Sequence, residues 1–200
     1  AEEVKSAGRK VSSLEEFLHI AREDFHEAYR IFTERHFSLI LSDQSEKIRS
    51  LYAGMSQQPV TYQHLEEFLI AAGAKEKVTL SLNREEASFY DVSESVQESL
   101  YIHRSGWGHL RADIEVNGDF LEVGKHVVTE EDFIGSTCEI NYVIRQEKLG
   151  KGNQYGEIIV KTPYQKLVYH VLASRGTESA VNLDLLEKQY RISLMKEYLG

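Results

Sequence analysis

The middle of the chain alternates apolar and polar residues with a period of two. The clearest run covers residues 109–116, where every second side chain is apolar. Successive side chains of a β-strand point to opposite faces, so this run predicts a strand with one buried and one solvated face. The same period recurs on both sides of this run, at Val78, Leu80, Leu82, Val96, Leu100, Ile102, Cys138, Ile140, Tyr142, Ile144, Ile158, Val160, Leu167, Tyr169 and Val171.

Residues that favour turns separate these predicted strands. They cluster at positions 105–108, 117–119, 135–136, 150–153 and 162–163, and they are mainly glycine, asparagine, aspartate, serine and proline. Short strands at close spacing with such turns between them are typical of a sandwich of antiparallel strands. We therefore expect an antiparallel β-sandwich over residues 77–174.

Three strings inside this region resemble bacterial immunoglobulin-like modules, namely residues 107–110, 118–123 and 149–160. The resemblance covers about half of the chain and implies the fold but little about function. A second resemblance rests on residues 28–33, 133–137 and 194–199. With these strings the chain is similar to the N-terminal part of a family of large bacterial proteins known only as a domain of unknown function, and this likeness implies no site residues.

The first part of the chain, residues 1–76, predicts a domain of short amphipathic helices. Ser12 and Ser13 stand three residues before Glu15 and Glu16, which is capping-box spacing for a helix start. Apolar residues at a spacing of three and four predict further helices near residues 24–32 and 44–53. A glycine at position 73 is suited to end a last helix. Together with the sandwich, this makes the predicted fold class α+β.

The string Leu-Glu-Glu-Phe-Leu occurs twice, at residues 14–18 and 65–69. One interpretation is a helical repeat, although solenoids need about three units to be stable. The other interpretation, which we favour, is that two amphipathic helices share common residues.

The last segment, residues 175–200, predicts a linker and a C-terminal helix. Leu186, Tyr190 and Leu194 recur every four positions and form an apolar stripe along one helix face. We expect this stripe to contact a protein partner or further domains of the same chain. The alternative is that the helix docks on the sandwich as a terminal strap.

Composition limits the classes of partner. The chain has 200 residues and a net charge of -9, without a basic patch or tail, which argues against binding nucleic acid. Its apolar runs are far shorter than the ~20 residues of a membrane-spanning helix, so no membrane insertion is expected. The single cysteine cannot form an internal disulfide. A cytoplasmic location follows as an expectation.

No group of residues forms a recognisable catalytic or metal-binding motif, so we predict no catalytic residues, no metal and no cofactor. Cys138 alternates with apolar residues and is interpreted as a buried, inert thiol. His103 and His109 flank one turn and could approach each other, but they lack the spacing of a zinc site. The acidic run at residues 130–132 is interpreted as a solvated loop.

Trp107 stands between glycines at one end of the predicted sandwich, and it allows two interpretations. Its ring could pack inward, which we favour, or it could be exposed as a platform for sugar rings together with Tyr101, Tyr155 and Tyr90. The sequence therefore predicts a non-catalytic interaction or scaffold segment of a larger multidomain protein. The alternative is a carbohydrate-binding module, and a catalytic site completed by other domains stays open.

Overall fold

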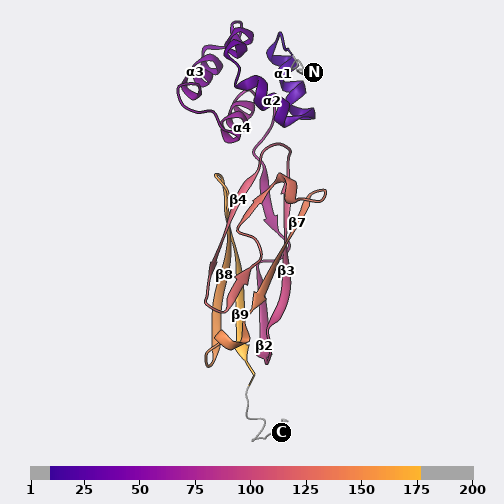
Figure 1. The fold of residues 1–200 in the computed structure, drawn as a ribbon, viewed down its shortest axis with the longest axis vertical. Helices are drawn as coiled ribbons and strands as arrows, with labels where there is room; N and C mark the ends of the chain where they lie inside the picture. The colour runs from indigo at the N-terminus through magenta and orange to yellow at the C-terminus, as the bar shows by residue number, and fades with distance from the viewer. Residues whose placement is uncertain (1–9, 177–200) are drawn as a thin grey trace, which may run out of the picture.

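The computed structural model describes residues 10–176, which form a helical part followed by a β-sandwich (Figure 1). The helices lie at one end of the sandwich along the long axis of the molecule, and β9 ends near the opposite end (Figure 1). The predicted fold class α+β is therefore confirmed for the described residues. The predicted C-terminal helix, with Leu186, Tyr190 and Leu194, lies outside the described residues and stays a prediction.

Four α-helices and a 3-10 helix make up the described helical part. They are α1 (Leu14–Glu23), α2 (Phe25–Phe32), η1 (Arg35–Leu41), α3 (Glu46–Met55) and α4 (Tyr62–Ala71). Every α-helix begins after a polar residue whose side chain accepts a backbone hydrogen bond from the first turn, as Ser13 does from Glu16. Such caps satisfy N–H groups that have no partner inside the helix. The helix starts predicted at Ser13 and near residue 24 are thus confirmed.

The helical part is held together by aromatic rings. Phe17, Phe32, Phe37 and Phe68 are almost completely buried, and the rings of Phe17 and Phe37 meet edge to face with centroids 4.6 Å apart. Phe37 comes from η1, an element that the sequence pattern did not predict. Because aromatic side chains bury large areas, this cluster supplies much of the core of a small helical unit.

The helix α4 ends just before a glycine, as the sequence predicted. Gly73 adopts a left-handed backbone conformation (φ +77°), and its N–H donates to the carbonyl of Ile70. The N–H of Ala74 donates to the carbonyl of Leu69, which completes a Schellman motif. The chain enters the sandwich only a few residues later, so the connection is short.

Nine strands form the described sandwich. They are β1 (Thr79–Leu82), β2 (Glu86–Val92), β3 (Val96–Ser105), β4 (Arg111–Asn117), β5 (Leu121–Val123), β6 (Val127–Thr129), β7 (Thr137–Ile144), β8 (Asn153–Lys161) and β9 (Lys166–Arg175). One sheet has the order β1-β3-β7-β5, and the other has the order β2-β9-β8-β4-β6. The sheets pack face to face as an immunoglobulin-like sandwich around one apolar core.

One strand pair differs from the antiparallel arrangement that we predicted. All other strand pairs of the described sheets are antiparallel, but β2 runs parallel to β9. Leu80 of β1 is hydrogen-bonded to Gln165, just before β9, and β2 pairs with β9 further along, from His170 to Arg175. The chain thus changes sheets through residues 83–85 without reversing direction. The strand therefore keeps its direction when it joins the edge of the second sheet.

The predicted alternation of β4 is confirmed. Ala112 and Ile114 are buried, whereas Arg111, Asp113 and Glu115 are exposed. Between the two sheets, the hydroxyl groups of Tyr142 and Tyr169 form a hydrogen bond of 2.9 Å. These polar tips can be buried because they satisfy each other.

The two copies of Leu-Glu-Glu-Phe-Leu both lie in helices, but in different surroundings. The first copy opens α1 and exposes Glu15, whereas the second copy lies inside α4 and buries Glu66. This difference favours the interpretation of two amphipathic helices with shared residues. Among residues 10–176, no helix is long and apolar enough to cross a membrane.

Candidate binding cleft between helices and sandwich

The loop that joins β3 to β4 brings the sandwich against α4. Glu66 and Lys75, each with a side chain only 1% exposed, form an ion pair beneath this loop. The second carboxylate oxygen of Glu66 accepts a hydrogen bond of 3.2 Å from the backbone N–H of His109. A buried carboxylate is stable only when it is paired and hydrogen-bonded, and both conditions are met here across the junction.

Gly108 allows this close approach. Its φ is +105°, and a Cβ atom built on it would lie 2.6 Å from both Glu66 Oε1 and Lys75 Nζ. Any other residue would be strained in this conformation and would also collide with the ion pair. The glycine is therefore required by the junction and not only by the turn.

Trp107 packs against the helical core, and its side chain is half-buried. The guanidinium carbon of Arg22 lies 5.4 Å from the ring centroid, and the ammonium nitrogen of Lys75 lies 5.1 Å from it. These distances are typical of cation–π contacts. The structure thus agrees with inward packing, but the ring packs on the helices rather than under the sandwich.

A second contact joins the two parts on the side of α4. Gln63 donates a hydrogen bond of 2.8 Å to the hydroxyl of Tyr164, which lies in the turn between β8 and β9. The ammonium group of Lys77 lies 4.8 Å above the Tyr164 ring. The helices are therefore fixed to the sandwich at two separate loops.

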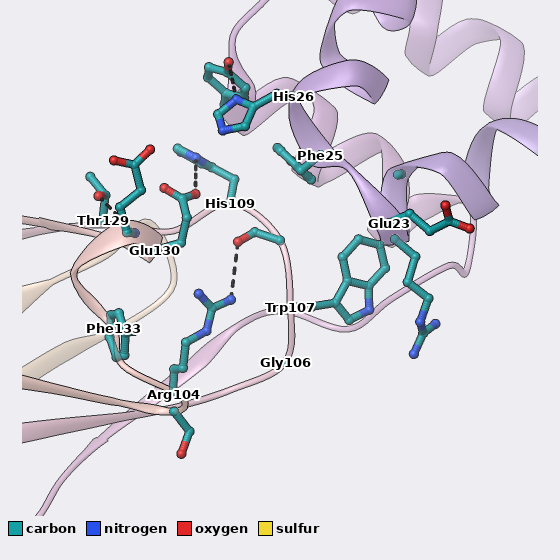
Figure 2. Close-up of a pocket in the computed structure, with 17 residues that line it drawn as sticks. Glu23, Phe25, His26, Arg104, Gly106, Trp107, His109, Thr129, Glu130 and Phe133 are labelled. Carbon is teal, nitrogen blue, oxygen red and sulfur yellow. Dashed lines mark hydrogen bonds and ion pairs between the residues drawn. The ribbon is translucent and has the colours of Figure 1, made fainter. Parts of the chain in front are cut away.

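A cleft of about 790 Å³ opens at this junction. The corner between α1 and α2 forms one wall, and the β3–β4 loop and the β6–β7 connection form the other (Figure 2). His109 stacks on the rings of Phe25 and Tyr62, with centroids 6.3 and 5.6 Å away. Open clefts with aromatic walls and a few polar groups are common ligand sites.

Arg104 is the central charge of this cleft. Figure 2 shows its side chain reaching up between Phe133 and Trp107. The guanidinium carbon lies 5.6 Å from the Phe133 centroid, and Nη2 donates a hydrogen bond of 3.3 Å to the carbonyl of Gly108. Burial lowers the pKa of Arg104, although Glu130 and Glu66 favour its charge from a distance.

Glu130 lies across the cleft from the helices, and one oxygen of its carboxylate, Oε1, has two partners. Its carboxylate is 3.3 Å from Nδ1 of His109 and accepts a hydrogen bond of 3.1 Å from the N–H of Leu110. Burial by itself would raise the pKa of Glu130, but the hydrogen bonds from His109, Leu110 and its own backbone, with the electrostatic effect of His109, together lower the pKa. The acidic run at 130–132 is thus partly structural, since the Asp132 carboxylate also accepts a hydrogen bond from the N–H of Thr129, the cap residue of the short helix η2 (Glu130–Asp132).

The structure does not bring the predicted aromatic residues together. Trp107 lies in the cleft, Tyr101 is exposed on β3 of one sheet, and Tyr155 is exposed on β8 of the other sheet. Tyr90 belongs to β2, in the same sheet as Tyr155. Sugar binding needs aromatic faces on one surface, so the carbohydrate-binding alternative is not supported.

The other candidate residues take structural positions. Cys138 is 2% exposed, and burial raises the pKa of its thiol. His103 hydrogen-bonds to Thr137 and to the carbonyl of Ser136, whereas His109 stacks in the cleft. Within residues 10–176, no group of three or more histidine, cysteine or acidic side chains could hold a metal ion.

Sequence reasoning did not find Glu66, Lys75 or Arg104. Glu66 has the same sequence neighbours as the exposed Glu15, and Lys75 follows it by nine positions, a spacing with no helical meaning. Arg104 lies one residue before a turn and resembles any polar strand residue. Only the docking of helices on the sandwich gives these residues a common role.

Several solved structures are similar to part of this chain. The PapD-like domain 7 of human CEP192 is 8% identical, with 48% of this chain and 84% of that chain covered and a TM-score of 0.37. The Escherichia coli chaperone DraB is 12% identical, with 48% and 55% covered and a TM-score of 0.37. A FixG-related protein from Vibrio parahaemolyticus is 11% identical, with 51% and 99% covered and a TM-score of 0.36. Such low identities and TM-scores support no argument about function.

No curated protein matches the sequence. One family model does, and it matches residues 1–200, the whole length of the chain. It describes the N-terminal domain of a family of unknown function, which agrees with the second resemblance seen in the sequence. The chain therefore belongs to the family of unknown function DUF5717, of which it is the N-terminal part.

Proposed function

We propose that this chain is a non-catalytic interaction segment in which helices and sandwich present one fixed surface. The observation that carries the proposal is the buried contact between α4 and the β3–β4 loop. Glu66, Lys75 and the backbone of His109 form a buried polar group that joins the two parts, and Trp107 packs beside it. A flexible pair of domains would not need such a group, because exposed linkers and wet interfaces are enough for independent modules.

The state of two ionisable groups, Glu130 in the cleft and Cys138 in the sandwich core, supports a binding role. A general acid near neutral pH needs a raised pKa, but the hydrogen bonds to Glu130 lower its pKa. The thiol of Cys138 is buried, with a raised pKa, so it is poorly suited to act as a nucleophile. These groups stabilise the fold and leave the cleft to bind.

Rotational diffusion tests whether the two parts form one unit. We expect the ¹⁵N relaxation rates of α4 and of β8 to fit one common anisotropic rotational diffusion tensor. In Lys75→Met the two elements should require different tensors, because this change leaves Glu66 buried without its partner. Lys161→Met, which removes an exposed lysine, is the matched control. Independent tumbling in the unchanged protein would contradict the proposal.

Photo-crosslinking tests whether the surface binds another protein. A photoreactive residue at position 134, beside the cleft, should give a defined adduct in cells that make the natural protein. Position 39 is a matched control because Leu39 is also an exposed aliphatic residue, 71% against 91% for Ile134, but lies in η1. Equal labelling at both positions, or a purified chain with a hydrolytic activity that one substitution removes, would argue against an interaction segment.

A further inference from the structure

We propose that the cleft binds a polypeptide segment that carries a carboxylate next to an apolar side chain. In this arrangement Arg104 pairs with the carboxylate, and Phe133, Trp107 and Ile134 contact the apolar side chain. The inference rests on the proposed function and names the partner chemistry for it.

The first argument is the state of Arg104. A guanidinium group has several N–H donors in a planar fork. Within residues 10–176, its one hydrogen bond from the side chain runs to the carbonyl of Gly108, at the long distance of 3.3 Å. The nearby carboxylates have other partners, because Glu66 pairs with Lys75 and Glu130 pairs with His109. Arg104 is thus a half-buried cation whose pKa is lowered by burial and whose donors fit a bidentate carboxylate.

The second argument is the balance of charge along the walls. Of the carboxylates in the lining, Glu23 lies 2.5 Å from His19, Glu130 lies 3.3 Å from His109, and Glu131 is exposed to solvent. Arg22 adds a second guanidinium at the rim, above the Trp107 ring. Positive charge is thus concentrated around Trp107, from Arg22 and Lys75 on its ring and from Arg104 beside it (Figure 2), although the whole chain is acidic.

The third argument is an apolar side chain beside the cleft. Ile134 is 91% exposed, the most exposed large apolar residue in the described part of the chain. It sits on a tight turn closed by pairing with Thr137, and its neighbours Phe133 and Gly135 line the cleft. Aromatic rings and arginine are enriched at protein interfaces, and the exposed Ile134 adds apolar surface beside them. A free inorganic anion would use Arg104 alone, so a polypeptide fits the site better.

Capped tripeptides test this site by NMR titration of the intact chain. The probes are acetyl-Leu-Asp-Leu-amide, its neutral counterpart acetyl-Leu-Asn-Leu-amide, and sodium acetate. The reporters are the indole N–H of Trp107, the single tryptophan, and the Nε–H of Arg104. We expect the Asp peptide to shift both signals and to bind about fivefold or more tighter than the Asn peptide, the usual size for a charge-assisted pair.

Variants assign the preference to Arg104. Arg104→Gln keeps an amide donor for the Gly108 carbonyl and should remove the preference for Asp over Asn. Arg111→Gln removes an exposed arginine of β4 outside the cleft and should leave both affinities unchanged. Burial disfavours the charge of Arg104, and this offsets the loss of its contact with Phe133, so Arg104→Gln should melt at about the same temperature as Arg111→Gln. A markedly lower melting temperature for Arg104→Gln would indicate a structural arginine instead.

Several other results of the titrations would contradict the proposal. Equal affinities for the two peptides, no shift with any probe, or an Asp preference that survives Arg104→Gln each overturn the site. Acetate that binds as tightly as the Asp peptide would make it a small-anion site and also overturn the proposal. A crosslink at position 134 that persists in Arg104→Gln would contradict the binding of a carboxylate by Arg104 but would agree with the proposed interaction function. Independent tumbling of helices and sandwich would instead contradict the proposed function itself.

Discussion

Glu66 and Lys75 form an ion pair from which water is almost excluded, and this pair lies where the helices meet the sandwich. Burial lowers the pKa of Lys75, while the carboxylate of Glu66 partly opposes that change. The loop residues Trp107, Gly108 and His109 all contact this pair. One buried charge pair thus determines how the loop is seated and how the two parts are joined.

We first predict that breaking the pair costs more than replacing it. Lys75→Met should reduce the free energy of unfolding by about 3 kcal/mol, because Glu66 then stays buried with only the His109 N–H as partner. The double variant Glu66→Leu/Lys75→Met should lose less, about 1–2 kcal/mol, for the orphaned N–H. Urea unfolding followed by Trp107 fluorescence measures both. A double variant less stable than Lys75→Met alone would contradict this account.

The second prediction concerns Gly108. Gly108→Ala should destabilise the protein by about 2 kcal/mol or more, since an alanine is strained at this positive φ and its Cβ would meet the ion pair. Gly54→Ala is the matched control, because Gly54 lies inside α3 with no atom within 4 Å of a new Cβ. That change should stabilise by about 0.5–1 kcal/mol. Thermal unfolding of the two variants measures both changes. Equal destabilisation of the two would contradict the proposed collision between the new Cβ atom at position 108 and the ion pair.

The β-sandwich could be predicted from sequence because its signal is local. Burial on one face leaves a period of two in each strand, as in β4, and glycine marks turns such as the one at Gly106. The direction of β2 could not be predicted, since it depends on which sheet edge the chain joins after β1. Helix starts were equally visible at Ser13 and Asp24, where the cap lies within three residues of its partner.

The candidate cleft could not be predicted, because it depends on docking between parts far apart in sequence. Glu15 and Glu66 occupy the same position of an identical string, yet only Glu66 meets Lys75 and the His109 backbone. Trp107 was found from its glycine neighbours, but its partner surface on the helices was not. Local periodicity indicates helices and strands, but it does not indicate which distant parts of the chain dock on each other.

The third prediction is a pH dependence at Glu130. Its pKa is lowered in the folded state, so its contribution to stability is present above the unfolded value of about 4.3 and is lost as the pH falls through the lower folded pKa. Glu130→Gln should be less stable than the unchanged protein by about 1 kcal/mol at pH 7, and the gap should close below about pH 4. Urea unfolding at several pH values measures the gap. Glu131→Gln, a change at the exposed neighbour, should show no such closing gap, and a gap for Glu130→Gln that is constant with pH would disprove the assignment.

The last prediction tests the register of the sandwich. Ile114 is 3% exposed in the core and pairs with Val160 on β8, whereas the next residue, Glu115, is exposed and 3.2 Å from Lys161. Ile114→Asp should destabilise by about 4 kcal/mol or more and unfold the sandwich, because it removes a core side chain and buries a carboxylate without a partner. Glu115→Gln should cost no more than about 0.5 kcal/mol, since a solvent-exposed ion pair contributes little. Circular dichroism melts of the two variants give the comparison. Similar melting temperatures would contradict this register, and a larger loss for Glu115→Gln would mean that the two faces of β4 are exchanged, as a shift by one residue would cause.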